Sequence, residues 1–131
     1  MDKISKVNST ENHKKKKYSW QYIEKAVNDL CLKIDKDKYV GVYGIPRGGL
    51  ILAVMLSHKL NLPLLTHESF MNSKILIVDD VSDSGSTIRE YARVHKNDVV
   101  TIHCKSCSTL KPTYYYEDID ENEWIVYPWE V

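Results

Sequence analysis

Two adjacent carboxylates followed by a loop of hydroxyl groups form the most informative stretch of the sequence. Four apolar residues at 75–78 run into Asp79 and Asp80. The loop after them supplies hydroxyls, a third carboxylate and a glycine, at Ser82, Asp83, Ser84, Gly85, Ser86 and Thr87. Hydroxyls and successive N–H groups at the start of a helix suit a phosphate monoester. Because Asp79 and Asp80 would repel a phosphate, we expect them to face sugar hydroxyls or a hydrated Mg²⁺. The stretch predicts a sugar phosphate ligand.

A second loop, Gly44-Ile-Pro-Arg-Gly-Gly49, carries the chemistry of an anion site. Four of the five glycines of the chain fall in these two loops, at Gly44, Gly48, Gly49 and Gly85, which favours close approach of the backbone to a ligand. Arg47 is one of only three arginines, and its guanidinium matches phosphate oxygens in a fork. The alternative is a surface arginine next to a turn.

Three other interpretations of the acidic stretch are possible on its residue types alone. It could be a turn between a strand and a helix with an aspartate as helix cap, since Asp and Ser are common N-cap residues. A P-loop is excluded because neither glycine loop has the GxxxxGK[ST] spacing. A phosphorelay receiver also ends its first strand in an acidic pair, but too little chain follows Asp80 to complete one.

Strands that alternate with helices must position these loops. The hydrophobic pattern predicts helices from the N-cap Ser19 to Ile34, over 50–60 and over 86–95, strands over 39–43, 74–78 and 99–104, and a short apolar run at 62–65. This alternation predicts an α/β, doubly wound and mainly parallel sheet. In such a sheet, ligands bind at the carboxyl ends of the strands.

The two ends of the chain differ from this pattern. Residues 1–17 are polar and basic and are expected to form a solvated tail, followed by a single domain over 18–131. Residues 114–131 are aromatic and acidic and are expected to form an appendage rather than another βα unit. Its carboxylates are expected to form a solvated face, at Asp118, Asp120, Glu121 and Glu123.

Composition limits the class of protein. A chain of 131 residues with 43% hydrophobic residues is long enough for one core. Lys plus Arg and Asp plus Glu both number 18, so no net field favours nucleic acid or an anionic membrane. Three cysteines, an odd number, and the lack of a long apolar stretch favour a cytoplasmic setting. The pair Cys104 and Cys107 lacks the second pair of a zinc site, so ordinary thiols are expected.

The motifs carry a resemblance to a known family. Residues 77–87 resemble the phosphoribosyl pyrophosphate (PRPP) signature of type I phosphoribosyltransferases, with its D-[ST]-G core and closing threonine, and residues 44–50 are similar to the family's pyrophosphate loop. The C-terminal part resembles the xanthine-guanine branch, at Lys105, Lys111-Pro112, Tyr114 to Tyr116 and Trp124 to Glu130. The match covers residues 19–131. The resemblance implies the fold of that family, with a small C-terminal hood mainly from 105–131, and a homodimer or higher homo-oligomer.

The resemblance also implies roles for the loop residues. The 5′-phosphate would be held by Ser84, Gly85, Ser86 and Thr87, and the loop pattern adds Ser82 to the residues expected to bind it. Asp79 and Asp80 would meet the ribose hydroxyls, and Asp80 would be the contact for Mg²⁺, the expected cofactor. The released pyrophosphate would be held by Arg47 with Gly48 and Gly49.

The remaining implied roles concern the purine. Asp83 would act as the general base at N7 or N9, or would only cap a helix. Lys105 would donate to O6, Trp124 would stack on the ring, and main-chain groups near Trp124 and Ile125 would contact the N1–C2 edge. Trp124 could instead serve core packing. The family usually has a mobile lid of a dozen or more residues before the PRPP strand, whereas this chain has only residues 66–73.

We therefore expect a purine salvage enzyme that transfers phosphoribose from PRPP to N9 of a 6-oxopurine. A lysine ammonium only donates, so guanine, hypoxanthine or xanthine should be accepted and adenine refused. The short lid keeps open a nonenzymatic PRPP- or nucleotide-sensing regulator on the same fold. A transferase for another base is a third alternative.

Overall fold

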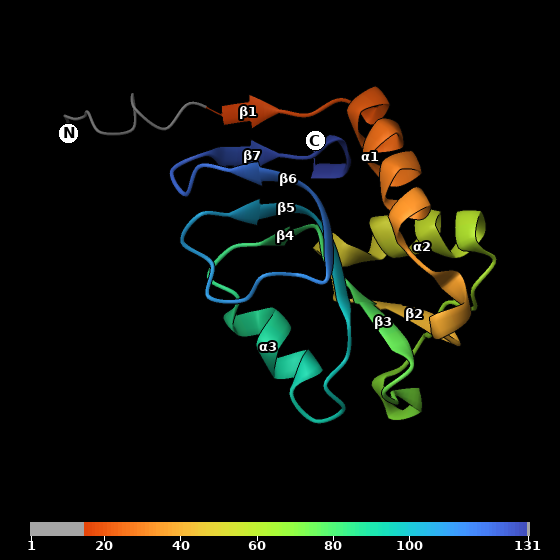
Figure 1. Cartoon of the computed structure of the whole chain (residues 1–131). Coiled ribbons are helices and arrows are strands. Elements are labelled where there is room, and N and C mark those ends of the chain that lie inside the picture. The colour runs from red at the N-terminus through yellow and green to blue at the C-terminus, as the bar shows by residue number, and fades with distance from the viewer. Residues whose placement is uncertain (1–14, 131) are drawn as a thin grey trace.

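The computed structural model describes residues 15–130 and has a parallel sheet with helices on both faces (Figure 1). The strands of the main sheet are β2 (Gly41–Gly44), β3 (Ile75–Val78), β4 (Val81–Ser82), β5 (Val99–Lys105) and β6 (Tyr114–Ile119). Helices α1 (Trp20–Lys33) and α2 (Gly48–Leu60) cover one face, and α3 (Ser86–Ala92) covers the other. The predicted α/β fold with a doubly wound parallel sheet is confirmed.

Strand β5 lies at the centre of this sheet. One of its edges pairs with β6, and the other pairs with β3 at its beginning and with β4 at its end. Strands β3 and β4 follow one another along the same edge of β5. Asp79 and Asp80 are the two residues between them. All these pairings are parallel, and β2 completes the sheet beside β3.

Strand β3 shows why this sheet has two cores. Its four residues are all buried, and alternate side chains point to opposite faces, as the period of a strand requires. Leu76 and Val78 join the cluster beneath α1 and α2, whereas Ile75 and Ile77 join the smaller cluster beneath α3. A strand buried on both faces is continuously apolar, which is the pattern of residues 75–78.

The helix boundaries follow local signals in the sequence. The Ser19 side chain accepts a hydrogen bond of 3.0 Å from the Tyr22 N–H at the start of α1, as predicted for an N-cap. Helix α2 ends at Leu60, and its C-cap Asn61 has a left-handed backbone with φ of 55°. Helix α3 is shorter than the predicted 86–95 and ends at Ala92.

Both ends of the chain differ from the prediction. Lys15–Lys17, placed in the tail, form β1, which pairs with β7 (Trp124–Val126), while residues 1–14 of the predicted tail lie outside the described residues. Residues 114–119, placed in the appendage, form β6 of the main sheet, because Val100 to Lys105 offer a free parallel edge. The hood that the resemblance places mainly in residues 105–131 has other bounds in the structure. The name is used below for the two-stranded sheet of β1 and β7, the turn at 120–123 and η4 (Pro128–Glu130).

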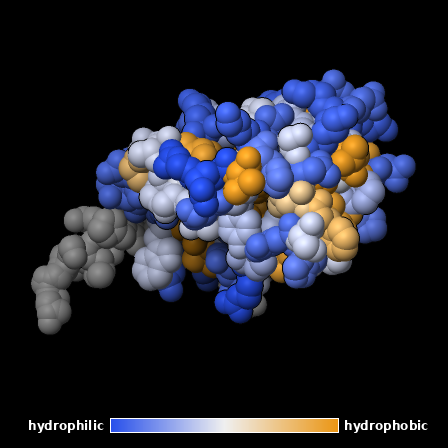
Figure 2. Space-filling view, turned by 90° about the horizontal axis from the view of Figure 1, so that it is seen from below, coloured by the Kyte–Doolittle hydropathy of each residue, from blue (hydrophilic) through white to orange (hydrophobic). Residues whose placement is uncertain are grey.

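The described surface is mainly polar, with apolar residues in small groups (Figure 2). Large apolar side chains are exposed at Trp20, Leu32, Val40, Leu50, Ile51, Val54, Phe70, Val94 and Trp124. Within residues 15–130, no helix combines the length and the apolar character needed to cross a membrane.

Candidate active site

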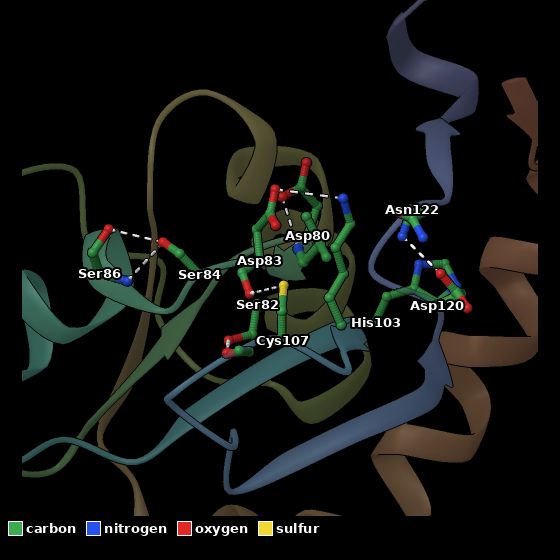
Figure 3. Close-up of polar contacts among 12 residues, drawn as sticks. Asp80, Ser82, Asp83, Ser84, Ser86, His103, Cys107, Asp120 and Asn122 are labelled. Atoms are coloured by element: carbon green, nitrogen blue, oxygen red, sulfur yellow. Dashed lines mark hydrogen bonds and ion pairs between the residues drawn. The ribbon is translucent and has the colours of Figure 1, made fainter. Parts of the chain in front are cut away.

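The carboxyl ends of the parallel strands bring most of the predicted residues to one edge of the sheet. Gly44 ends β2, Val78 ends β3, Ser82 ends β4 and Lys105 ends β5. Figure 3 shows Asp80 and Asp83 close together at this edge, with Ser84 and Ser86 on one side and Asn122 of the hood on the other. The site is therefore built by loops that a rigid sheet holds in place.

The acidic pair forms its centre. Asp79 accepts a hydrogen bond of 2.9 Å from the Asp80 N–H, and Asp80 accepts one of 2.8 Å from the Val81 N–H. Burial raises the pKa of both carboxyl groups, and the neighbouring charge of Asp80 raises the pKa of Asp79 further. Two partly buried carboxyl groups of this kind are suited to a cation or to hydroxyl donors, either of which would offset the cost of their charge.

The two glycines that begin α2 allow this helix to approach the acidic pair. A Cβ added at Gly48 would lie 2.2 Å from Asp80 Oδ2, and one added at Gly49 would lie 2.3 Å from the Val78 carbonyl oxygen. Neither position can hold a larger residue without displacing the acidic pair or the end of β3. Arg47 precedes them as an exposed side chain, and the peptide bond between Pro46 and Arg47 is cis.

The hydroxyl loop turns sharply at Gly85. Gly85 has φ of 91°, and an added Cβ would lie 2.8 Å from the Leu110 nitrogen, so this position requires glycine. Ser84 and Ser86 are exposed, with their hydroxyl oxygens 3.0 Å apart. Together with Thr87, which is also exposed, they form an open cradle of hydroxyls and backbone N–H groups.

Ser82 does not belong to this cradle. Its side chain is completely buried, with Oγ 2.8 Å from the Leu110 carbonyl oxygen and 2.7 Å from Ser108 Oγ. The prediction that its hydroxyl holds a phosphate is wrong, because β4 turns this side chain into the protein. Gly49 is likewise buried, whereas Gly48 lines the site.

Asp83 and Lys105 meet across the site. The Lys105 ammonium lies 3.5 Å from Asp83 Oδ2, and the exposed fractions of the two side chains are 14% and 64%. Lys105 is thus held inside the site while Asp83 reaches toward solvent. On the hood, Trp124 is half-exposed, and the ammonium of Lys15 lies 4.6 Å from the centre of its ring.

Three pockets meet at the acidic pair. The serine pocket, of about 220 Å³, is lined by Ile45, Pro46, Asp79, Asp80, Val81, Asp83, Ser84, Gly85, Thr87 and Ile88. The arginine pocket, of about 730 Å³, is lined by Arg47, Gly48, Ile51, Asp79, Asp80, Trp129 and Glu130. The hood pocket, of about 510 Å³, is lined by Asp80, Val81, Asp83, Lys105, Glu121, Asn122, Glu123, Trp124, Ile125, Tyr127 and Glu130. Asp80 lines all three, so one ligand with three arms could occupy them together.

Several lining residues were missed by the sequence analysis. Glu121 and Glu123, predicted to lie on a solvated face, line the hood pocket together with Asn122. Tyr127 and Glu130 line it as well, although neither had a predicted role. Their closeness to Trp124 and Ile125 in the sequence is the signal that could have identified them.

A magnesium ion is compatible with this donor set. Within the described residues, no cluster of three or more His, Cys, Asp or Glu side chains is arranged to hold a metal ion without other ligands. Mg²⁺ commonly takes one or two carboxylates and completes its shell with water and substrate phosphates. The carboxylates of Asp79 and Asp80, beside the arginine pocket, provide that partial set.

Comparisons with known proteins give the family. No family model matches the chain. It is 23% identical over 137 residues to a xanthine-guanine phosphoribosyltransferase of Idiomarina loihiensis, covering 86% of this chain and 85% of the relative. The structure of a purine phosphoribosyltransferase from Pyrococcus horikoshii is similar at 30% identity with a TM-score of 0.74, covering 89% of this chain and 95% of that one. A hypothetical protein from Neisseria gonorrhoeae with bound ppGpp has the same fold, at 24% identity and a TM-score of 0.72, covering 91% of this chain and 92% of that one.

These matches extend over most of the chain and agree with the parallel sheet and its strand-end loops. The chain belongs to the type I phosphoribosyltransferase family, and it is related at low identity to the xanthine-guanine phosphoribosyltransferases.

Proposed function

We propose that this protein transfers the 5-phosphoribosyl group of PRPP to N9 of a 6-oxopurine, guanine, hypoxanthine or xanthine, and releases pyrophosphate, as in purine salvage. The single observation that carries the proposal is the meeting of three pockets at Asp80. PRPP and a base together have the matching three parts: a 5′-phosphate, a pyrophosphate and a purine, joined at one ribose.

The two phosphate-bearing ends of PRPP fit two of the pockets. The 5′-phosphate lies in the serine pocket, where Ser84, Gly85, Ser86 and Thr87 offer hydroxyls and N–H groups. The pyrophosphate lies in the arginine pocket, held by the Arg47 guanidinium and by the N–H group of Gly48, because the N–H group of buried Gly49 already donates to the Ile45 carbonyl oxygen. Asp79 and Asp80 accept hydrogen bonds from the ribose hydroxyls between them.

The purine lies in the hood pocket. Lys105 donates to its O6 atom, Trp124 stacks on the ring, and main-chain groups near Ile125 contact its N1–C2 edge. Asp83 is within reach of the imidazole part of the base, where it accepts the proton that the purine loses when N9 bonds to the ribose carbon. Before the purine binds, the 3.5 Å contact with Asp83 keeps Lys105 directed toward this pocket.

Charge is the other requirement of the reaction. Mg²⁺ bound at Asp80 would neutralise charge on the departing pyrophosphate. The Arg47 guanidinium also neutralises charge on the departing pyrophosphate. The half-buried acidic pair lies near the sugar carbon that gains positive charge during transfer, which carboxylates stabilise.

A nucleotide-sensing regulator is the second candidate. The segment 66–73, where a lid is expected, contains only the short helix η3 (Glu68–Phe70), and none of its residues lines the three pockets. The similar fold from Neisseria gonorrhoeae was solved with bound ppGpp. Arg47 and Asp83 favour catalysis, since a sensor needs no general base.

The experiment that separates these functions is an assay of nucleotide formation from PRPP and Mg²⁺ with a panel of guanine, hypoxanthine, xanthine, adenine and orotate. A transferase of this type forms nucleotide with at least one 6-oxopurine and not with adenine or orotate. A sensor binds nucleotide by calorimetry and forms none. Turnover of orotate or adenine alone would indicate a transferase for another base.

A further inference from the structure

Tyr127 connects the hood to the acidic pair, and no step of the proposed reaction uses it. It lies between β7 and η4 and is buried, with an exposed fraction of 2%. Its hydroxyl oxygen is 3.2 Å from the Asp80 carbonyl oxygen, which is 47 residues away in the sequence, and 2.7 Å from His103 Nδ1. Its ring stacks on Trp129 with a centroid distance of 4.9 Å.

The hydrogen bonds around His103 decide which way the Tyr127 hydroxyl points. His103 is fully buried, so its ring is neutral and carries one N–H group. Its Nε2 atom is 2.9 Å from the Tyr22 hydroxyl, which also contacts the exposed carboxylate of Glu117. The Tyr22 hydroxyl donates its single proton to Glu117, so it accepts from the Nε2–H group of His103, and the unprotonated Nδ1 atom accepts from Tyr127. The Tyr127 hydroxyl therefore directs its proton toward His103 Nδ1 and the Asp80 carbonyl oxygen, 2.7 Å and 3.2 Å away, and ties the hood to β5 as well as to the Asp80 peptide.

We propose that Tyr127 is a positioning residue that fixes the hood against the Asp80 peptide and so sets the distance between the purine and the ribose. The inference rests on the proposed function, because it assigns the hood pocket to the base. Trp124 and Ile125, which line the hood pocket, lie three and two residues before this anchor in the chain, so this wall depends on the place of Tyr127. Trp129, which lines the arginine pocket, is held by the ring stack, which does not need the hydroxyl.

The anchor acts on the hood more than on the acidic pair. The Asp80 carbonyl also accepts hydrogen bonds from the N–H groups of Ile102, at 3.0 Å, and His103, at 3.2 Å, so it stays in place without Tyr127. The hood would lose its direct hydrogen bond to this peptide. Without the Tyr127 hydroxyl, the affinity for a ligand that spans the hood and serine pockets should therefore fall. The affinity for a ligand that does not reach the hood pocket should be unchanged.

Tyr127→Phe tests this, because it keeps the aromatic stack and removes only the hydroxyl. Tyr39→Phe is the matched control: Tyr39 is also buried, with an exposed fraction of 6%, and its hydroxyl donates to Asp98 at 2.6 Å and contacts Tyr114 at 2.9 Å, away from the three pockets. The measurements are calorimetric affinities for guanosine monophosphate and for PRPP with Mg²⁺, and thermal unfolding of each variant.

In Tyr127→Phe, the affinity for guanosine monophosphate should fall about tenfold, while that for PRPP should change by less than about twofold. The KM for guanine should rise with it, and the KM for PRPP should not. Tyr39→Phe should keep both affinities even where its thermal stability falls.

Equal losses for both ligands, an unchanged affinity for the nucleotide, or the same split in Tyr39→Phe would each overturn the role of Tyr127. A parent protein that binds neither ligand would overturn the proposed function itself, and with it this inference. A parent that binds both, beside a variant without the split, would overturn the inference alone.

Discussion

The exposed carboxylate of Asp83 is the residue on which catalysis most depends in the proposed reaction. Asp83→Asn keeps its shape and removes the base, so kcat should fall at least ~10²-fold while nucleotide affinity stays within a few-fold. Steady-state kinetics and calorimetry measure the two effects. Asp37→Asn, which changes an exposed carboxylate in the short helix η2 (Lys36–Lys38), away from the residues that line the three pockets, serves as control. Full turnover in Asp83→Asn would remove the assigned role.

Ser84 tests where the 5′-phosphate binds. Ser84→Glu puts a carboxylate into the serine pocket, where it would repel a phosphate. We expect affinity for both PRPP and guanosine monophosphate to fall below detection by calorimetry. Ser73→Glu adds the same charge at an exposed site before β3 and should bind normally. Undiminished binding by Ser84→Glu would mean that the phosphate lies elsewhere.

Lys105 tests how the base is recognised. Lys105→Met keeps the apolar stem and removes the ammonium, and losing a charged hydrogen bond of ~1.5–3 kcal/mol corresponds to a loss of roughly 10- to 100-fold in kcat/KM. The loss should be similar for all 6-oxopurines that are accepted, with KM for PRPP nearly unchanged. Lys111→Met, an exposed lysine on the same connection, is the control. An unaltered KM for the purine would contradict the contact to O6.

For individual residues, the sequence predicted the residue types of the site better than the directions of their side chains. The acidic pair and the glycines at 48, 49 and 85 were evident because each motif is local and depends on chemistry or on close backbone approach. Ser82 was misassigned because a hydroxyl in a motif gives no indication of which face of β4 it occupies. The contact between Tyr127 and His103 could not be found from sequence, because 24 residues separate two side chains that meet in space.

The hood is the element that the sequence described least well. Three lysines suggest a solvated segment, and their side chains are indeed exposed, but the backbone of β1 pairs with β7 in a register that joins Lys16 to Ile125. Strand pairing depends on backbone hydrogen bonds, which composition does not reveal. Similarly, β6 is acidic and aromatic because it lies at the edge of the sheet, where a strand need not be continuously apolar.

The pairing of β1 with β7 can be tested by a backbone change. Lys16→Pro removes an N–H group within β1 and disfavours its pairing, so the hood should loosen. We expect KM for the purine to rise several-fold, with less effect on KM for PRPP. Lys16→Ala keeps the backbone and removes only the ammonium, which lies 4.0 Å from Glu123, and it separates the two contributions. Equal behaviour of the two variants would show that the pairing has no part in holding the base.

The whole molecule combines a zero net charge with strongly local fields. Its 18 basic and 18 acidic residues cancel, yet the site edge concentrates carboxylates around Arg47 and Lys105. Within the described residues, an anion site confined to Arg47, Lys105 and the two glycine loops fits a small phosphorylated ligand better than a long polyanion. The sequence could predict this much because charge balance and the two glycine loops are both visible in it.

Stability should depend on pH through the buried core of the molecule. Burial lowers the pKa of His103 from 6.5 to about 4, so the unfolded chain takes up a proton at His103 before the folded protein does. The contribution of neutral His103 to the free energy of unfolding is complete above pH 6.5. It decreases as pH falls toward 4, by ~1.4 kcal/mol per pH unit.

The measurement is urea unfolding of the metal-free, ligand-free protein and of His103→Gln at pH ~7.5 and ~5. The parent should lose ~2 kcal/mol more than the variant between these values, because only the parent has the buried imidazole. His58→Gln, which changes an exposed histidine near the end of α2, should follow the parent. An identical pH dependence in His103→Gln and the parent would contradict a neutral, buried His103.

The central claim is that a phosphoribosyl group is transferred to a purine where the three pockets meet. The ratio of the two products tests this claim most directly. Purified protein is given guanine, PRPP and Mg²⁺, and guanosine monophosphate and pyrophosphate are quantified in the same reaction, with Asp83→Asn as the control. The account predicts one nucleotide for each pyrophosphate in the parent and little of either in the variant. Pyrophosphate released without nucleotide, or binding of both substrates with no product, would contradict it.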